Sequence, residues 1–111
     1  MKSWETLIKR VLVESRKDIE WIIVLSSNGD VLGKFSPRDI SEETLNEIIK
    51  IIKSEIFPHN IKHVDIMLED ESHIIIVKKG KEYIVSKTRV KPNLGKIYVI
   101  LRKIFGGEVS E

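Results

Sequence analysis

Two short stretches of the sequence, residues 21–25 and 74–77, are apolar at every position. Consecutive side chains of a β-strand point to opposite faces of its sheet. A strand that is apolar throughout must therefore be covered on both faces. This feature constrains the fold more than any other, because it requires one sheet with helices packed on each side.

The first stretch belongs to a predicted strand over 19–25, which is followed by the turn signal Ser-Asn-Gly-Asp at 27–30. Asn-Gly is a pair that supplies the two positive φ values of a two-residue hairpin turn. The chain then returns as a second strand over 31–35. We therefore expect a β-hairpin here, with Asn28 and Gly29 as its two left-handed residues.

Three more strands are predicted over 64–68, 73–77 and 83–88, with a turn over 78–82. The first of the three alternates apolar and polar residues, which is typical of a half-buried or edge strand. The apolar 73–77 is expected in the interior of the sheet. These strands follow one another too closely for crossover helices, so the sheet must be antiparallel here.

Three stretches have the apolar spacing of an amphipathic helix. The predicted helices are 3–16, 42–57 and 94–105. Ser3 and Ser41 stand where N-capping side chains are preferred. Pro58 ends the second helix, and Gly106-Gly107 ends the third. We expect residues 106–111 to form a frayed, flexible tail.

The predicted order of elements is therefore α-β-β-α-β-β-β-α. With 111 residues the chain has room for one domain, 1–111, whose ordered core we place at 3–105. The expected fold class is α/β (α+β), a three-layer sandwich in which helices cover both faces of a five-stranded antiparallel sheet.

The composition excludes several classes of protein. There is no cysteine, so disulfides, thiol catalysis and cysteine zinc sites are ruled out. No apolar run approaches the ~20 residues of a membrane-spanning helix, and no signal-peptide pattern follows Met1. We therefore expect a cytoplasmic protein. Ala and Gln are absent while Ile, Lys and Glu abound, which is typical of a thermophile or of an AT-rich genome.

The small net charge of +2 conceals a basic C-terminal third. Residues 78–103 carry nine basic side chains and a single acidic one, Glu82. Such a segment suits an acidic partner, an anionic lipid surface or nucleic acid, or it forms a solvated face that keeps the protein soluble. Single-strand binding also needs aromatic stacking platforms, and the segment offers only Tyr83 and Tyr98.

No catalytic or metal-binding motif is found. Residues 29–35 resemble a phosphate-binding loop, but the two glycines are one residue too close and Phe35 stands where a hydroxyl is needed. His59 and His63 are four residues apart, but Pro58 and Asn60 argue against the helix that would align them as zinc ligands. No serine lies in a hydrolase motif. We predict no enzyme activity, no metal and no cofactor. The histidines are His59, His63 and His73, and the serines considered as candidate nucleophiles are Ser26, Ser27 and Ser36.

Two motifs bear on the family of this chain. The first is the strand that leads into 27–32, Ser-Asn-Gly-Asp-Val-Leu, and the second is 93–97, Asn-Leu-Gly-Lys-Ile, which opens the last helix. At both places the sequence resembles the Roadblock family of dynein light chains and regulators of small Ras-like GTPases, of archaeal or bacterial type. The resemblance covers about 3–105. It implies a non-catalytic protein that dimerises through the second helix and third strand and docks a small GTPase or an adaptor protein.

The residues themselves favour the same dimer seam. The apolar residues of the second helix span about 160° of arc, more than the ~100° that a core face needs. The excess, Ile48 and Ile51, either rests on a large sheet or remains available to a second subunit. Strand 64–68 also has no Pro or central Lys to protect an edge. The predicted symmetric seam consists of Ile48, Ile51, Ile52, Val64, Ile66 and Leu68.

The polar face of the second helix is the predicted partner-binding surface, unless it is an ordinary solvated face. It consists of Glu43, Asn46, Glu47, Lys50, Lys53 and Ser54, among which we expect a Glu47–Lys50 ion pair. The predicted function is a non-catalytic homodimeric regulator or scaffold for a small Ras-like GTPase. The alternatives are a ligand-sensing or profilin-like α/β module, and a basic protein that binds nucleic acid or an anionic surface.

Overall fold

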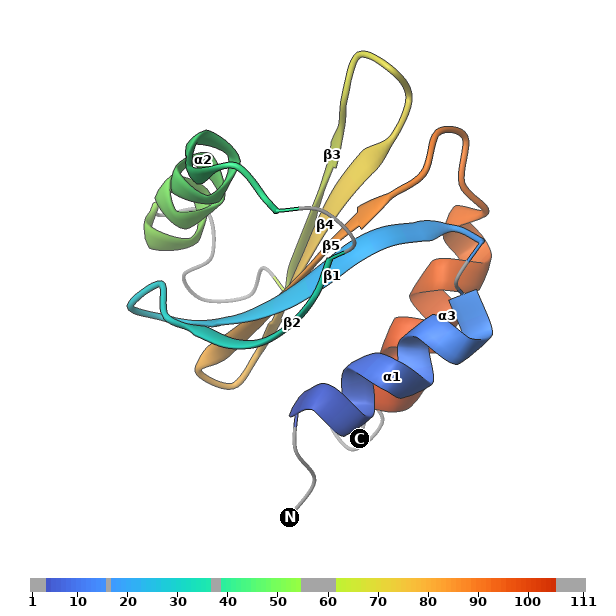
Figure 1. Ribbon diagram of the computed structural model, residues 1–111, viewed down its shortest axis with the longest axis horizontal. Helices are drawn as coiled ribbons and strands as arrows, with labels where there is room; N and C mark the ends of the chain where they lie inside the picture. The colour runs from blue at the N-terminus through green and yellow to red at the C-terminus, as the bar shows by residue number, and fades with distance from the viewer. Residues whose placement is uncertain (1–3, 16, 37–38, 55–61, 106–111) are drawn as a thin grey trace.

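The computed structural model describes residues 4–15, 17–36, 39–54 and 62–105 (Figure 1). Its eight elements follow the predicted order. They are α1 (Trp4–Ser15), β1 (Ile19–Ser26), β2 (Val31–Phe35), α2 (Glu42–Lys53), β3 (His63–Met67), β4 (His73–Lys79), β5 (Glu82–Thr88) and α3 (Leu94–Phe105). None of the described helices is long and apolar enough to cross a membrane.

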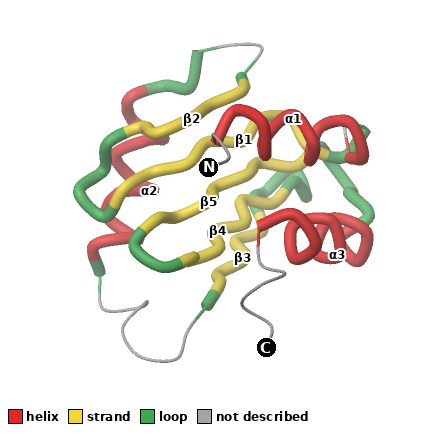
Figure 2. The backbone as a smooth tube through the Cα atoms, turned by 90° about the horizontal axis from the view of Figure 1, so that it is seen from below, coloured by secondary structure: helices red, strands yellow, loops and turns green. Residues whose placement is uncertain are grey.

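The five strands form one antiparallel sheet in the order β2-β1-β5-β4-β3 (Figure 2). The sheet joins the β1–β2 hairpin to the β3-β4-β5 meander through β1 and β5, which pair in a register that places Ile23 opposite Val85. The predicted antiparallel sheet is confirmed. β1 and β4 are interior strands, as the apolar runs predicted, and β3 is an edge strand.

The helices cover both faces of the sheet, which confirms the three-layer sandwich. α1 and α3 lie side by side on one face, and α2 lies on the other (Figure 1). β1 explains why both layers are needed, because it contributes side chains to two separate cores. Ile22 and Val24 pack beneath α1 and α3, whereas Ile23 and Leu25 pack on the α2 side.

The β1–β2 turn forms where predicted but has a different backbone. Gly29 is left-handed, with φ +94°, whereas Asn28 is not among the described residues with positive φ. The turn is closed by the Ser26 N–H, which donates to the Asp30 carbonyl over 2.9 Å. Ser26 Oγ also accepts from the N–H groups of Asn28 and Asp30. These bonds support a wider loop, so the expected two-residue turn with a left-handed Asn28 is wrong.

The remaining boundaries differ slightly from those predicted. β3 begins and ends one residue earlier than expected, and the β4–β5 turn is reduced to Gly80 and Lys81. α2 is described to Lys53, and its predicted extension over 55–57 lies outside the described residues. The N-cap predicted at Ser3 and the tail predicted over 106–111 also lie outside them.

Candidate functional site

A groove of about 520 Å³ lies between α2 and the β3–β4 half of the sheet. It exists because α2 leaves that part of the sheet face uncovered. Its apolar lining comes from both walls of the groove and from the loops beside them. The lining consists of Trp21, Ile40, Ile48, Ile51, Ile66, Leu68 and Ile74, with Glu20, Asp39, Ser41, Thr44, Glu47 and Lys87 as its polar residues.

The charges of this groove are mainly acidic. Lys87 donates to Glu20 over 2.8 Å, so that these two charges compensate each other. Asp39 and Glu47 add two further carboxylates to the lining. Glu47 also pairs with Lys50 over 3.5 Å on the exposed helix surface. The groove therefore combines apolar walls with an acidic rim.

The predicted seam residues divide into two groups. Ile48 and Ile52 are only 2% and 5% exposed, because they pack into the core between α2 and the sheet. The sequence left open whether Ile48 rests on the sheet or remains available to a partner, and in the single chain it rests on the sheet. The part of the apolar arc of α2 that contains Ile48 packs on the sheet.

The other predicted seam residues are partly exposed, namely Ile51, Val64, Ile66 and Leu68. Ile51, Ile66 and Leu68 line the same groove, and Val64 lies on the same face of β3 as Ile66 because the strand alternates. These four residues form a continuous apolar strip from α2 to the edge of the sheet.

All six predicted partner-binding residues are exposed on α2 and its C-terminal end. Four of them, with Ile49, line a shallow hollow of about 530 Å³: Asn46, Lys50, Lys53 and Ser54. The expected Glu47–Lys50 ion pair is present. Ser41 is the N-cap that precedes α2, and its Oγ accepts from the Thr44 N–H over 3.1 Å. The polar surface and the apolar strip thus adjoin on one helix.

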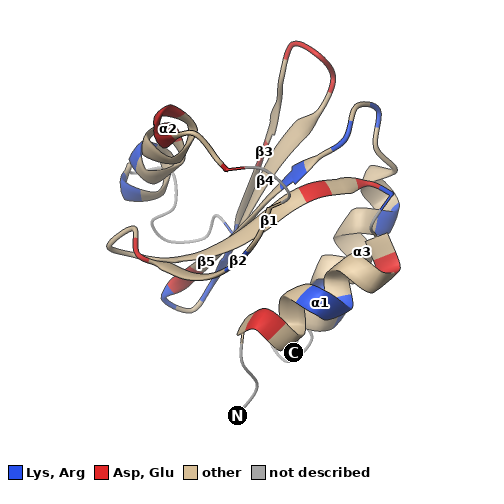
Figure 3. Cartoon of the chain, viewed as in Figure 1, with Lys and Arg blue, Asp and Glu red and all other residues tan. Residues whose placement is uncertain are grey.

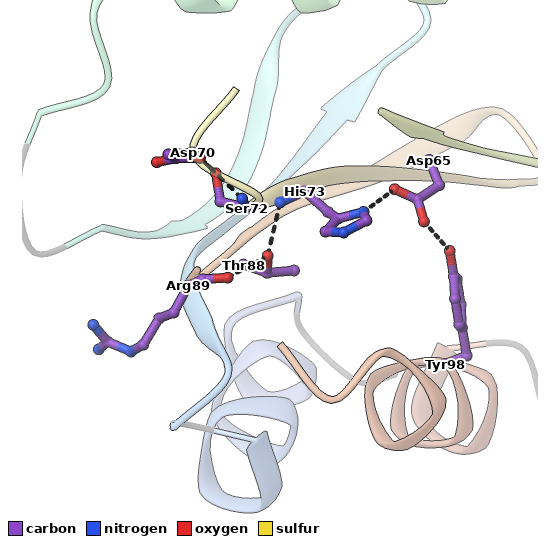
Figure 4. Close-up of polar contacts among 7 residues, drawn as sticks. All are labelled: Asp65, Asp70, Ser72, His73, Thr88, Arg89 and Tyr98. Carbon is purple, nitrogen blue, oxygen red and sulfur yellow. Dashed lines mark hydrogen bonds and ion pairs between the residues drawn. The ribbon is translucent and has the colours of Figure 1, made fainter. Parts of the chain in front are cut away.

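Sequence reasoning missed a polar network on the opposite face of β3 (Figure 4). Asp65 lies 2.7 Å from His73 Nδ1 on β4 and accepts from the Tyr98 hydroxyl of α3 over 2.8 Å. The His63 and Tyr98 rings also lie 5.3 Å apart. Partial burial, together with Asp65, raises the pKa of Tyr98 to about 12. The network ties the edge strand to β4 and α3.

The sequence carried one signal for this network. The alternation of β3 puts Asp65 on the face opposite Ile66, which is the face that α3 covers. Tyr98 follows the apolar spacing of α3, and its hydroxyl reaches beyond that apolar stripe to Asp65.

The turns at this end of the sheet are also held by hydrogen bonds (Figure 4). Asp70 accepts from both the N–H and the hydroxyl of Ser72, and these bonds lower the pKa of Asp70. The His73 N–H donates to Thr88 Oγ1 over 2.8 Å. Within the described residues, no three His, Asp or Glu side chains gather where they could hold a metal ion. His59 lies outside the described residues.

Comparison with known proteins gives a likeness of fold. No family model and no curated protein sequence matches the chain. Among solved structures, the Roadblock/LC7 domain from Streptomyces avermitilis superposes with a TM-score of 0.74 at 15% identity, over 96% of this chain and 99% of that one. An MglB structure with a tetrameric arrangement gives 0.70 at 9% identity, over 92% and 82%.

Profilin IB from Acanthamoeba castellanii has a similar fold, with a TM-score of 0.65 at 14% identity over 97% of this chain and 98% of that one. At such low identities the similarity concerns the fold alone. The chain therefore has the fold of Roadblock/LC7 domains, which confirms the architecture that the sequence motifs implied, and profilins have a similar fold.

Proposed function

We propose that this chain is a non-catalytic, cytoplasmic, dimeric scaffold or regulator that binds a small Ras-like GTPase. The observation that carries this proposal is the apolar strip of Ile51, Val64, Ile66 and Leu68, which runs from α2 to an edge strand. The Roadblock/LC7 fold supports the proposal, because the family includes GTPase regulators.

The edge strand β3 is well suited to pair with a second copy. It has no further strand beside it in the described sheet, and it contains no Pro or central Lys to prevent pairing. Its central charge, Asp65, is engaged with His73 and Tyr98 on the α3 side. An antiparallel β3–β3 pair would continue the sheet and bring two apolar strips together. The tetrameric MglB shows that a protein of similar fold assembles.

This dimer would also produce a doubled charged platform. Each α2 would lie beside the seam, so two sets of exposed residues would face the same side of the joined sheet. We propose that the GTPase docks on this platform, which consists in each copy of Glu43, Asn46, Glu47, Lys50, Lys53 and Ser54.

The seam is tested by placing a charge in the apolar strip. Ile51→Glu and Ile66→Glu should each give a folded monomer, because both positions are partly exposed in the single chain and become buried only on pairing. Val13→Glu, on the outer face of α1, is the matched control and should remain a dimer. Light scattering measures the mass of each variant, and circular dichroism shows whether the variant is folded. A dimer mass for both seam variants would contradict the proposed seam.

The partner is tested by pull-down from the native lysate with GDP or a non-hydrolysable GTP analogue. A small GTPase, identified by mass spectrometry and recovered in one nucleotide state, would support the proposal. The double variant Lys50→Glu/Lys53→Glu should lose it, whereas Lys9→Glu on α1 should retain it. Recovery of no GTPase with either nucleotide would contradict the proposed function.

The alternative of a profilin-like interaction module is favoured by the likeness to profilin IB. The pull-down distinguishes this alternative from the GTPase scaffold. With a profilin-like module, it would recover a protein other than a GTPase, and the recovery would not depend on the added nucleotide. A ligand-sensing role would use the groove between α2 and the sheet, where Ile51, Ile66 and Leu68 also belong to the proposed seam, so a ligand there would compete with the dimer.

A further inference from the structure

The basic segment predicted over 78–103 does not form one patch in the folded chain (Figure 3). Lys78, Lys79 and Lys81 lie at the β4–β5 turn, whereas Arg89 and Lys91 follow the opposite end of β5. Several of these cations are engaged within the chain, since Lys87 pairs with Glu20 and Lys79 donates to the Phe105 carbonyl. The basic residues that are close together in the sequence over 78–103 are therefore spread over separate parts of the folded chain.

A different basic surface arises where α1 and α3 lie side by side (Figure 2). The described residues of these two helices carry five cations and two carboxylates. Glu14 is compensated by Lys103 over 3.0 Å, and Lys96 lies 3.9 Å from Asp18, so that Glu5 is the one carboxylate of the two helices left to oppose the other cations. The cations are Lys9, Arg10, Lys96, Arg102 and Lys103, of which Lys9, Arg10 and Arg102 form no ion pair among the described residues.

The same surface exposes two large apolar side chains. Val13 is 83% exposed on α1, and Val99 is 63% exposed on α3. Val13 follows Lys9 and Arg10 by about one helical turn, and Val99 has Lys96 and Arg102 within a turn on either side. Basic side chains are attracted to anionic lipid headgroups, and apolar side chains beside them can enter the membrane interface.

We propose that this α1–α3 face binds an anionic lipid surface. The face lies on the side of the sheet opposite α2 (Figure 1), so lipid binding leaves the groove and the charged platform free. The strength of lipid binding rests on the proposed dimer. A two-fold axis perpendicular to the joined sheet would place the α1–α3 faces of the two copies on the same side of the dimer. Two faces on one surface bind more tightly than either alone.

Charge and shape favour lipid over nucleic acid as the occupant. Single-stranded nucleic acid is bound in basic grooves with exposed aromatic platforms. The aromatic side chains of α1 and α3 are instead engaged, since Trp4 stacks with Phe105 at 6.3 Å and Tyr98 bonds to Asp65. Two adjacent helices give a broad face on which Lys and Arg reach lipid phosphates while Val13 and Val99 enter the headgroup layer.

The test is co-sedimentation of the full chain with vesicles of phosphatidylcholine mixed with phosphatidylglycerol, against pure phosphatidylcholine. The chain should sediment only with the anionic vesicles, and less so as salt is raised. Arg10→Glu/Arg102→Glu should weaken partitioning by at least about 30-fold, because each basic residue near the surface contributes about fivefold and each new carboxylate is repelled by the lipid phosphates. Val13→Ser/Val99→Ser should remove the binding that survives high salt. Circular dichroism checks that both variants fold.

The matched control is Lys50→Glu/Lys53→Glu on α2, which makes the same change of charge on the other side of the sheet. It should retain sedimentation close to that of the wild type. An equal loss in this control, or no sedimentation of the wild type at low salt, would overturn the proposal. So would binding of single-stranded DNA without binding of the vesicles.

The proposed dimer can be tested independently of the lipid-binding face. The monomeric Ile66→Glu variant should bind the anionic vesicles more weakly than the wild type, because it presents one face instead of two. If wild type and variant are both monomers and bind alike, the lipid face is supported and the dimer is overturned.

Discussion

At the scale of single residues, Asp65 holds the edge of the sheet in place. It lies on β3, accepts from the Tyr98 hydroxyl over 2.8 Å and contacts His73 over 2.7 Å. These two partners come from α3 and β4, so one carboxylate joins three elements. Asp65 thereby stabilises β3 without occupying the opposite, apolar face, where the proposed seam lies.

We expect alkaline pH to weaken the fold through Tyr98. Its pKa rises to about 12, first because of its burial and then because of Asp65. An unfolded chain loses this proton near pH 10, so the folded chain binds more protons between these values. The stability is therefore complete below about pH 10 and falls as pH rises towards 12.

Tyr98→Phe isolates this effect. The substitution should cost about 1 kcal/mol near neutral pH through the lost hydrogen bond, and the alkaline loss of stability should be smaller than in the wild type. Urea unfolding measured at a series of pH values gives both quantities. Identical alkaline profiles for the two proteins would contradict the role given to Tyr98.

Two glycines should respond to the same substitution with opposite signs. A Cβ added at Gly33 on β2 would lie 2.8 Å from Trp4 Cβ, closer than such atoms approach, so α1 would have to move. Gly33→Ala should therefore destabilise the chain by about 1–3 kcal/mol. A Cβ at Gly95 in the first turn of α3 meets only Asn93 Oδ1 at 3.8 Å.

Gly95→Ala is thus the matched control and should stabilise the chain by up to about 1 kcal/mol, because alanine favours the helix. The midpoint of urea unfolding measures both changes. A tolerated Gly33→Ala would show that α1 does not pack on β2 as closely as described.

At the scale of elements, α2 differs from α1 and α3. It lies alone on its face of the sheet (Figure 1), and it buries only Ile48 and Ile52 completely. Its ends therefore contribute a larger share of its stability. Ser41 caps the first turn, where Glu42 and Glu43 are favoured by the positive end of the helix dipole.

Ser41→Ala should destabilise the chain by about 1 kcal/mol, since the Thr44 N–H loses its capping acceptor. Because α2 carries Ile51 of the proposed seam, the variant should also dimerise more weakly. Ser27→Ala, in the exposed β1–β2 turn, is the control and should change neither property. Urea unfolding measures the change in stability, and light scattering over a dilution series measures the change in dimerisation. Wild-type stability in Ser41→Ala would show that the cap contributes little.

At the scale of the whole molecule, the strand order determines which backbone groups are accessible. β5 lies in the middle of the sheet, and β2 and β3 form its two edges. Only one of these edges adjoins the apolar strip on the α2 side. The proposed dimer would therefore protect the β3 edge and leave the β2 edge open.

Hydrogen exchange should show this asymmetry. Amides of β5 should exchange slowest, and alternate amides of β3 should be protected in the wild type but exchange faster in Ile66→Glu. The amides of β2 should exchange alike in both proteins and provide the internal control. Equal exchange of β3 in the two proteins would contradict edge-to-edge pairing.

Most of the fold could be predicted from the sequence, because the periods of apolar residues and the turn residues are local signals. The apolar runs placed β1 and β4 inside the sheet, and the alternation of 64–68 indicated an edge. The predicted partner-binding residues were all exposed, since polar residues on one helix face turn towards solvent. The seam was harder to predict, because periodicity alone does not tell how far a sheet extends beneath a helix.

The sequence by itself therefore determined the elements, their order and the need for helices on both faces of an antiparallel sheet. Only the tertiary structure decided that β1 pairs with β5, that Ile48 is buried, and that the basic segment is dispersed while α1 and α3 form a new basic face. It also decided that Asp65 meets His73 and Tyr98. These outcomes depend on contacts between residues distant in the chain, which no local pattern of side chains specifies.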